Sequence, residues 1–178
     1  GAPGIATGTD FPGNCYLAYQ KLLKDLSRRG VLLAIASKNN EADVKEVFAR
    51  RAADLALHLD DFASVQVGWN SKVDSLKKIA FDLSLGLESF VFADDSPVEC
   101  AEVRRSLPEV QVLCLPAENP YDYVNLIRST AAFDARAVTR DDLGRAQEYQ
   151  AQKQRQALQE RVVSREEFLQ ALGMKYTL

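Results

Sequence analysis

The chain has 178 residues, of which 47% are hydrophobic and 26% charged, and its formal net charge is -3 at pH 7. This composition is enough for one globular domain with a core, and it excludes the strongly basic surface on which nucleic-acid binding depends. No apolar run approaches the length of a bilayer span, and three cysteines without regular spacing predict neither a disulfide framework nor a zinc ribbon. We therefore expect a cytoplasmic protein that contacts neither nucleic acid nor membrane.

The chain begins with a segment rich in Gly, Pro and Thr, GAPGIATGTDFPGN, which predicts a loop. A helix is predicted next, over residues 14–30, and it ends in two arginines and Gly30, a cationic last turn followed by a glycine stop. The run VLLAIAS, residues 31–37, is apolar without interruption. Such short runs are typical of strands that are buried on both faces of a parallel sheet.

Helices and strands continue to alternate after this first pair. Asn40, Ser96 and Asn119 are predicted to cap the helices that follow them, and a further helix is predicted from Ser71 to a stop near Gly86. Further strands are predicted at residues 89–93 and 110–115, and residues 64–69 are predicted to be a short strand or a strand-like loop.

Strands that alternate with helices of this length predict an α/β fold with a doubly wound, three-layer parallel sheet. We assign residues 1–130 to this sheet domain. The chain then becomes polar and helical over residues 139–162, and the stretch SREEFLQAL carries a capping box of Ser164 and Glu167. Residues 131–178 are therefore predicted to form a C-terminal helical extension of the same domain.

Polar side chains that could carry chemistry fall at the ends of three predicted strands. Ser37 closes VLLAIAS, Asp94 and Asp95 follow SFVFA, and Lys72 follows the strand at 64–69. Ligands of open parallel sheets collect at the carboxyl ends of the strands, so these groups are expected to converge on one crevice. Adjacent carboxylates repel each other unless a cation compensates, and Mg²⁺ favours carboxylate oxygens while keeping waters for a phosphate. The set predicts phosphoryl chemistry.

Each of these residues also has an ordinary structural interpretation. Asp-Asp before Ser-Pro could be only the turn into a helix that Ser96 caps, with Pro97 at its first position and Glu99 closing a capping box. A single Lys72 is most often a solvated lysine, and a single Ser37 is most often a residue that ends a strand. The combination at three strand ends is what favours the functional interpretation.

The sequences of three segments are similar to those of a known protein family. RGVLLAIASKNNEADVKEVF, GWNSK and SFVFADDSPVECAEVRRSLPEVQV resemble the FkbH-like branch of the haloacid dehalogenase (HAD) superfamily, and DFPGNCYLAYQKLL is similar to the stretch after that branch's first motif. The resemblance covers nearly the whole chain. It implies a HAD-like Rossmannoid fold and a Mg²⁺-dependent transferase with phosphatase chemistry. Such an enzyme loads a glyceryl unit from 1,3-bisphosphoglycerate, a phosphorylated three-carbon acyl donor, onto the thiol of an acyl carrier protein in polyketide biosynthesis and releases phosphate.

The same resemblance assigns roles to individual residues. It makes Ser37 the phosphate ligand of motif two and Lys72 the lysine of motif three. Asp94 and Asp95 become the acids of motif four and the metal ligands, with Asp94 favoured as the direct or water-mediated ligand of Mg²⁺. Beside Ser37 and Lys72, the residues expected to bind substrate are Lys38, Asn39, Trp69 and Asn70. The alternative is that Asn39 and Asn70 are ordinary loop residues and that the indole of Trp69 is packed against the protein.

The first motif of the superfamily, a strand that ends in Asp-x-Asp-x-Thr and supplies the nucleophile, is absent from this sequence. Asp10 in TGTDFPG is no substitute, because no apolar strand precedes it. The resemblance places the missing strand in the middle of the sheet. Without it, two strands would face an empty slot, at a cost of about 1–3 kcal/mol for each buried unpaired backbone group. We therefore expect upstream residues to supply this strand.

The FkbH-like branch is thought to pass its acyl group through an enzyme cysteine. Cys15 is the candidate here, because the first turn of a helix favours a thiolate. Cys100 is expected in the core and Cys114 inside a buried strand. His58, the only histidine, has no partner for a zinc site or a Ser-His-Asp triad and is expected to be a surface or packing residue.

Two rival functions remain open. One is a small-molecule phosphatase of the same superfamily, which would turn over with every cysteine replaced. The other is a degenerate, non-catalytic domain that only docks a carrier protein, and the absence of the first motif favours it. The polar helix predicted at 139–160 could serve as a docking surface under either function, although a solvated face is the commoner explanation of such charge.

Overall fold

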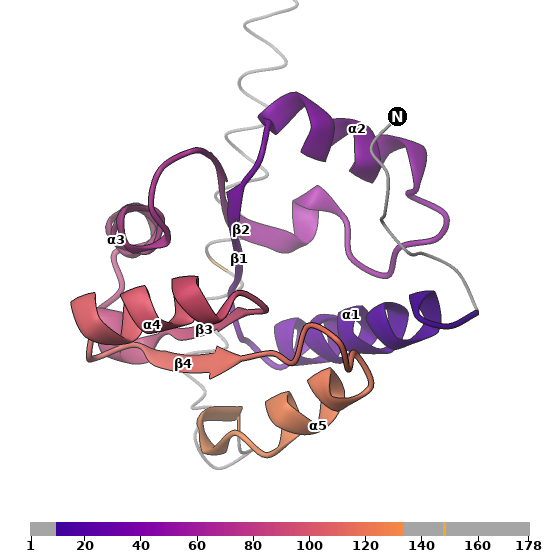
Figure 1. The fold of residues 1–178 in the computed structure, drawn as a ribbon. Helices are drawn as coiled ribbons and strands as arrows, with labels where there is room; N and C mark the ends of the chain where they lie inside the picture. The colour runs from indigo at the N-terminus through magenta and orange to yellow at the C-terminus, as the bar shows by residue number, and fades with distance from the viewer. Residues whose placement is uncertain (1–9, 134–147, 149–178) are drawn as a thin grey trace, which may run out of the picture.

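The computed structural model describes residues 10–133 and residue 148. Helices and strands alternate as predicted, and each predicted strand is present with bounds that differ by a residue or two (Figure 1). The strands are β1 (Leu33–Lys38), β2 (Phe62–Gly68), β3 (Val91–Asp94) and β4 (Gln111–Cys114). The helices are α1 (Gly13–Arg28), α2 (Glu41–Arg50), α3 (Lys72–Leu83), α4 (Pro97–Ser106) and α5 (Asp122–Arg128), with short 3-10 turns at Leu59–Asp61, Leu87–Ser89 and Ala131–Phe133.

Two predictions concern the C-terminal extension and contact with a membrane. The helical extension predicted at 131–178 lies outside the described residues, except for the turn Ala131–Phe133 and the single residue Glu148. No helix in the part of the chain that is described is long and apolar enough to cross a membrane.

The strands form two parallel pairs. β1 pairs with β2, with Ser37 opposite Val67, and β3 pairs with β4, with Asp94 opposite Cys114. Among the described residues these are two separate two-stranded sheets, so β1 and β3 do not pair with each other. Figure 1 shows the pairs as separate ribbons that run in different directions. The described strands thus form the two halves of the predicted sheet, divided at the place where the sequence predicts that a strand is missing.

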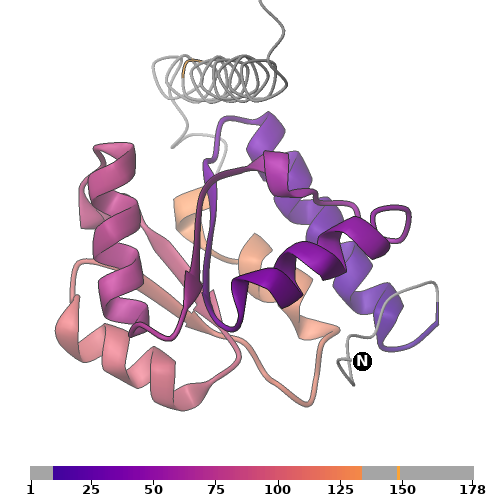
Figure 2. The ribbon, with the colours of Figure 1, turned by 90° about the horizontal axis from the view of Figure 1, so that it is seen from above.

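Helices cover both sides of the strands, as a doubly wound fold requires. α3 and α4 lie together on one side, and α1, α2 and α5 lie on the other (Figure 2). The connections β1–α2–β2 and β3–α4–β4 each return the chain to a parallel neighbour, as is usual in α/β proteins, whereas β2–α3–β3 leads from one pair of strands to the other. The predicted α/β class and its three layers are confirmed.

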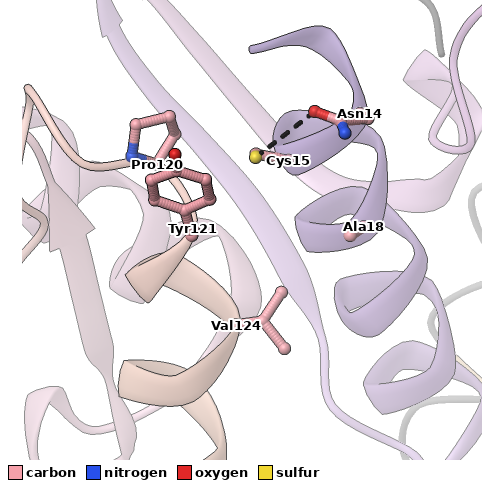
Figure 3. A pocket seen from close by; sticks show the side chains of 6 residues that line it. All are labelled: Asn14, Cys15, Ala18, Pro120, Tyr121 and Val124. Carbon is pink, nitrogen blue, oxygen red and sulfur yellow. Dashed lines mark hydrogen bonds between the residues drawn. The ribbon is translucent and has the colours of Figure 1, made fainter. Parts of the chain in front are cut away.

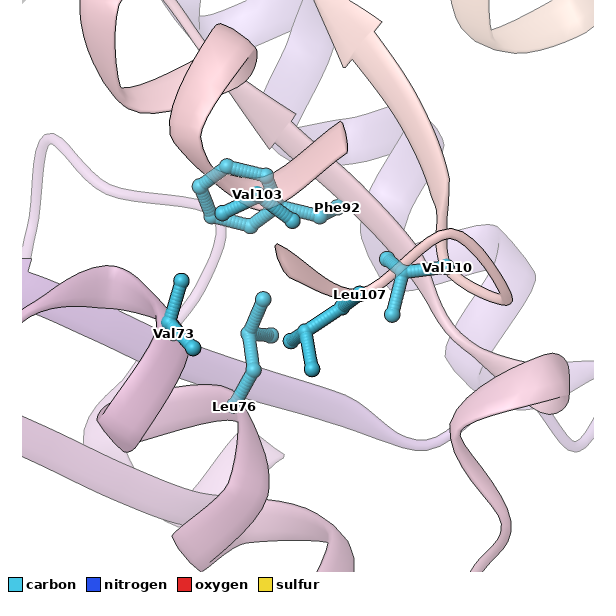
Figure 4. Close-up of a cluster of buried hydrophobic side chains, with 6 residues drawn as sticks. All are labelled: Val73, Leu76, Phe92, Val103, Leu107 and Val110. Atoms are coloured by element: carbon cyan, nitrogen blue, oxygen red, sulfur yellow. The ribbon is translucent and has the colours of Figure 1, made fainter. Parts of the chain in front are cut away.

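Each half-sheet has its own apolar core. The larger core joins α3, β3 and α4, and Val103 in it is fully buried (Figure 4). Its members are Val73, Leu76, Phe92, Val103, Leu107 and Val110. The smaller core consists of Leu33, Leu57 and Phe62 under side chains of α1 and α2. Burying such side chains contributes about 1.5–3 kcal/mol each. Because α3 also packs on β1 and β2, its side chains in the larger core connect the two half-sheets.

Two helix ends show how the sequence stops a helix. α1 ends at Arg28, and Gly30 adopts a φ of 102°, as the predicted glycine stop requires. α3 was expected to stop near Gly86, but it ends at Leu83 because Ser84 takes the left-handed conformation with a φ of 52°. Its start agrees with prediction, since Ser71 precedes the first helical residue and its Oγ accepts a hydrogen bond from the backbone N–H of Asp74 at 3.0 Å.

Candidate functional site

Lys72 links the two half-sheets at the carboxyl ends of their strands. It is the first residue of α3, and its Nζ lies 2.9 Å from Asp94 Oδ2 and donates to the backbone oxygen of Ala36 at 2.6 Å. The side chains of Lys72 and Asp94 are only 10% and 11% exposed. Lys72 is therefore not the solvated lysine of the ordinary interpretation, and its contacts bring the start of α3 together with the ends of β1 and β3.

The backbone at the start of α4 fixes the other oxygen of Asp94. Asp94 Oδ1 accepts a hydrogen bond from the N–H of Ser96 at 2.9 Å, and Ser96 Oγ accepts one from the N–H of Glu99 at 3.4 Å. The predicted capping box is thus only half formed, because Asp94 takes the position on Ser96 N–H that Glu99 was expected to occupy. The Glu99 carboxylate instead pairs with Lys38, at 2.5 Å between Oε1 and Nζ.

Asp94 and Asp95 are adjacent but have different surroundings. Asp94 Oδ1 accepts a hydrogen bond and Oδ2 forms an ion pair, whereas Asp95 is exposed and its carboxylate makes no hydrogen bond or ion pair with any described residue. The two like charges are tolerated because Lys72 neutralises one of them and solvent reaches the other. Asp95 is therefore the member of the pair whose oxygens are free to bind a cation.

The chemistry of these donors fits Mg²⁺, although their number is small. Mg²⁺ is usually held by one or two carboxylates, and waters and substrate phosphates complete its octahedron. In the described ranges, no group of three or more His, Cys, Asp or Glu side chains could hold a metal ion. Asp95, with Asp94 beside it, can thus supply only part of a magnesium site.

The other predicted substrate-binding residues lie on the same edge without contacting the Lys72–Asp94 pair. Ser37 is half-buried, and its hydroxyl makes no hydrogen bond with the residues that are described. Asn39 and Asn70 are exposed, and Asn39 Oδ1 accepts the N–H of Asn40. The Trp69 side chain is 74% exposed, so the alternative of a packed indole is wrong. Apart from the Asn39 hydrogen bond, no hydrogen bond or ion pair ties these side chains to the rest of the described structure.

Tyr123 lies near the acid pair, which the sequence did not predict. It is buried in the first turn of α5, and its ring packs edge-on against Tyr16 and Tyr19, with centroids 6.0 and 5.5 Å away. Burial raises the pKa of Tyr123, and the negative charge of Asp95 adds to this effect. No sequence motif predicts that Tyr123 lies near the acid pair, because only the packing of α5 against α1 creates this position.

Cys15 lines a cavity of about 240 Å³ between the first turns of α1 and α5 (Figure 3). Its thiol is half-buried and donates to Asn14 Oδ1 at 3.4 Å, and the predicted place in the first turn of a helix is confirmed. The lining is completed by Ala18, Pro120, Tyr121 and Val124. The structure therefore places the candidate thiol in a small, mainly apolar hollow.

The remaining cysteines and the histidine are placed differently from Cys15. Cys100 is fully buried, as predicted, and burial, followed by its hydrogen bond with Cys114, raises its pKa to about 12. Cys114 lies in β4 but is only half-buried. His58 is an exposed residue whose ring pairs with the backbone oxygen of Ala52 at 3.2 Å, in agreement with the predicted surface position. None of the three offers a free reactive group at the site.

Comparison with known proteins gives one informative match. No protein-family model matches the chain, and no curated protein matches it. A solved structure that does match is the N-terminal part of the protein BF1531 from Bacteroides fragilis, which contains a phosphatase domain and is complexed with Mg. The two sequences are 36% identical, the TM-score is 0.63, and the match covers 74% of this chain and 33% of that one. This chain thus spans about a third of the length of its neighbour, and it shares the fold of a phosphatase-containing protein.

Proposed function

We propose that this chain belongs to a Mg²⁺-dependent, HAD-type phosphatase domain and supplies the phosphate-binding and cation-binding strand ends of its active site. The observation that carries the proposal is the buried Lys72–Asp94 pair, 2.9 Å apart at the carboxyl ends of parallel strands, with the free carboxylate of Asp95 beside it. The identity of 36% to a structure that contains a phosphatase domain and Mg supports it.

The geometry suggests a division of labour among the side chains. The ammonium of Lys72 has three donors, and two of them are directed to Asp94 and to the Ala36 carbonyl, so one remains for a phosphate oxygen. Ser37 can donate its free hydroxyl to another. Asp94 orients Lys72, and Asp95 offers its oxygens to Mg²⁺, which reverses the expected preference for Asp94. Bound Mg²⁺ would offset the charge that the phosphoryl oxygens carry.

The nucleophile has to come from elsewhere. The sequence has no strand that ends in Asp-x-Asp-x-Thr, and Asp10 lies exposed in a bend just before α1. We therefore propose that the reaction requires a strand that enters between β1 and β3 and brings an aspartate next to Lys72. The unpaired neighbouring edges of β1 and β3 are consistent with such a strand.

The test is phosphate release from p-nitrophenyl phosphate, measured with Mg²⁺ and with EDTA, by the chain joined to a first-motif strand. Lys72→Met keeps the volume of the side chain but removes its charge, and we expect a loss of about 100-fold in kcat because charge at a developing anion is lost. Lys77→Met is the matched control, since Lys77 is exposed on the same helix. Undiminished turnover by Lys72→Met, or full activity in EDTA, would contradict the proposal.

The finer proposal is that the domain transfers a glyceryl unit from 1,3-bisphosphoglycerate to an acyl carrier protein. The resemblance to the FkbH-like branch supports it, and so does the thiol of Cys15 in a cavity beside α5. Intact-protein mass spectrometry with both substrates should show a glyceryl adduct that Cys15→Ser abolishes and Cys114→Ser retains. Phosphate release without any adduct would leave a phosphatase. If neither phosphate nor an adduct is formed, the remaining function is that of a domain that only docks the carrier protein.

A further inference from the structure

A second ion pair crosses between the two half-sheets, and the proposed function does not use it. Lys38 is the last residue of β1, and Glu99 lies in the first turn of α4. Lys38 Nζ and Glu99 Oε1 are 2.5 Å apart. Lys38 directly follows Ser37. The hydrogen bond to Glu99 and, to a smaller extent, the negative charge of Asp94 raise the pKa of Lys38, so its ammonium lies near the Lys72–Asp94 pair.

Glu99 is held more firmly than a surface glutamate. Its side chain is only 16% exposed, and its second oxygen, Oε2, is buried without a hydrogen-bond partner among the described residues. A carboxylate oxygen in that position has lost its water, at a cost that an ordinary surface rotamer would avoid. Glu99 is also released from the capping box, because Asp94 already accepts the N–H of Ser96. The carboxylate is therefore a fixed point to which the flexible lysine side chain attaches.

We propose that Glu99 is a positioning residue, which holds the Lys38 ammonium at the rim of the site so that Lys38 binds the phosphate group of the substrate together with Lys72. This inference rests on the proposed function, because it assigns a binding role at the same site. An unrestrained lysine would lose rotamer freedom when it closes on a ligand, whereas a lysine held by Glu99 has already lost most of that freedom.

The opposite effect, repulsion of an anion by Glu99, is the main physical objection. Two features make it the weaker effect. Lys38 is 34% exposed and Glu99 is 16% exposed, so the positive end of the pair lies nearer to solvent and to an arriving ligand. The ammonium also has three N–H donors, and the contact with Glu99 uses one of them. The hydrogen bond to Glu99 raises the pKa of Lys38, which keeps the ammonium charged.

The experiment uses the chain joined to a first-motif strand, and it measures the affinity for inorganic phosphate by calorimetry in the presence of Mg²⁺, alongside kcat and KM for p-nitrophenyl phosphate. We expect Glu99→Ala to raise the Kd for phosphate by about tenfold and Glu99→Gln by about threefold, since the amide can still accept from Lys38. KM should rise with Kd, while kcat changes little. Glu102→Gln is the matched control, because it removes the same charge from α4 without breaking a contact with Lys38, and its Kd should stay within about twofold of wild type.

The variants separate positioning from the two other roles. A Kd that stays unchanged or falls in Glu99→Ala would show that Glu99 acts only as an opposing charge, and the inference would be wrong. The double variant Lys38→Glu with Glu99→Lys restores the ion pair with the cation on α4. If it also restored the Kd, Glu99 would be a structural clasp between half-sheets, which overturns the inference as well.

The experiment also distinguishes failure of the proposed function from failure of the inference about Glu99. If the chain joined to a first-motif strand binds phosphate but hydrolyses nothing, the proposed function is wrong, and the comparison of Glu99→Ala with Glu99→Gln still decides the role of Glu99. If hydrolysis occurs and Glu99→Ala leaves Kd and KM at their wild-type values, only the inference fails. A wild-type chain that binds no phosphate overturns both.

Discussion

At the scale of single residues, the adjacent acids show how one pair of carboxylates can have two roles. Asp94 is only 11% exposed, forms an ion pair with Lys72 and accepts a hydrogen bond from the N–H of Ser96, while Asp95 is exposed. Breaking a buried ion pair leaves the other charge without compensation, which costs far more than removing a solvated charge. The two acids should therefore respond very differently to the same substitution.

We predict that Asp94→Asn lowers the free energy of unfolding by about 3 kcal/mol, because the buried Lys72 loses its counter-charge. Asp95→Asn should change it by less than about 0.5 kcal/mol, as is usual for exposed positions. Urea unfolding followed by circular dichroism measures both. Equal effects of the two substitutions would mean that Lys72 does not depend on Asp94 in solution.

At the scale of the helices, the two cap residues Ser71 and Asn40 look alike in sequence and differ in structure. Ser71 Oγ accepts from the N–H of Asp74 at 3.0 Å, and this bond fixes the turn in which Lys72 begins α3. Asn40 precedes α2, but its side chain makes no cap hydrogen bond and instead contacts Asp43. A preference for cap residues marks both helix starts, whereas only the contacts of the folded chain decide which side chain caps.

Ser71→Ala is accordingly expected to lower the free energy of unfolding by about 1 kcal/mol, the usual effect of losing a cap hydrogen bond. Asn40→Ala is its matched control and should cost only a few tenths of a kcal/mol, since no cap bond is lost. Thermal unfolding of the two variants under the same conditions compares them. A larger effect from Asn40 than from Ser71 would contradict the assigned caps.

At the scale of the whole molecule, the division of the sheet is the feature with most consequence. β1 pairs only with β2 and β3 only with β4 among the described strands, and side chains rather than backbone join the halves. Lys72–Asp94 and Lys38–Glu99 both cross this boundary. A sheet held in this way has unpaired backbone groups along two neighbouring edges, and each buried one is costly.

We predict that a strand ending in Asp-x-Asp-x-Thr, fused before residue 1, raises the midpoint of thermal unfolding by several degrees. The added strand would pair with β1 and β3 and satisfy the backbone groups on their free edges. Each degree of increase in the midpoint of unfolding corresponds to a small part of the resulting stabilisation. A fusion of equal length with Pro at alternate positions is the control, because proline cannot donate to a sheet ladder. If both fusions shift the midpoint of unfolding equally, the added strand does not pair with the free edges of β1 and β3.

Much of this protein follows from local pattern. Short apolar segments predict the strands, and cap and stop residues bound the helices. Their alternation predicts the α/β class, because periodicity and capping act within a few residues. The strand-end rule also predicts that Ser37, Lys72 and Asp94 lie on one edge. The tertiary structure decided what depends on neighbours distant in sequence: that Asp94 rather than Asp95 binds Lys72, that Glu99 leaves its capping box for Lys38, and that Tyr123 lies by the acids. Such choices depend on which donors and charges surround a side chain once the chain is folded, and no local pattern contains that information.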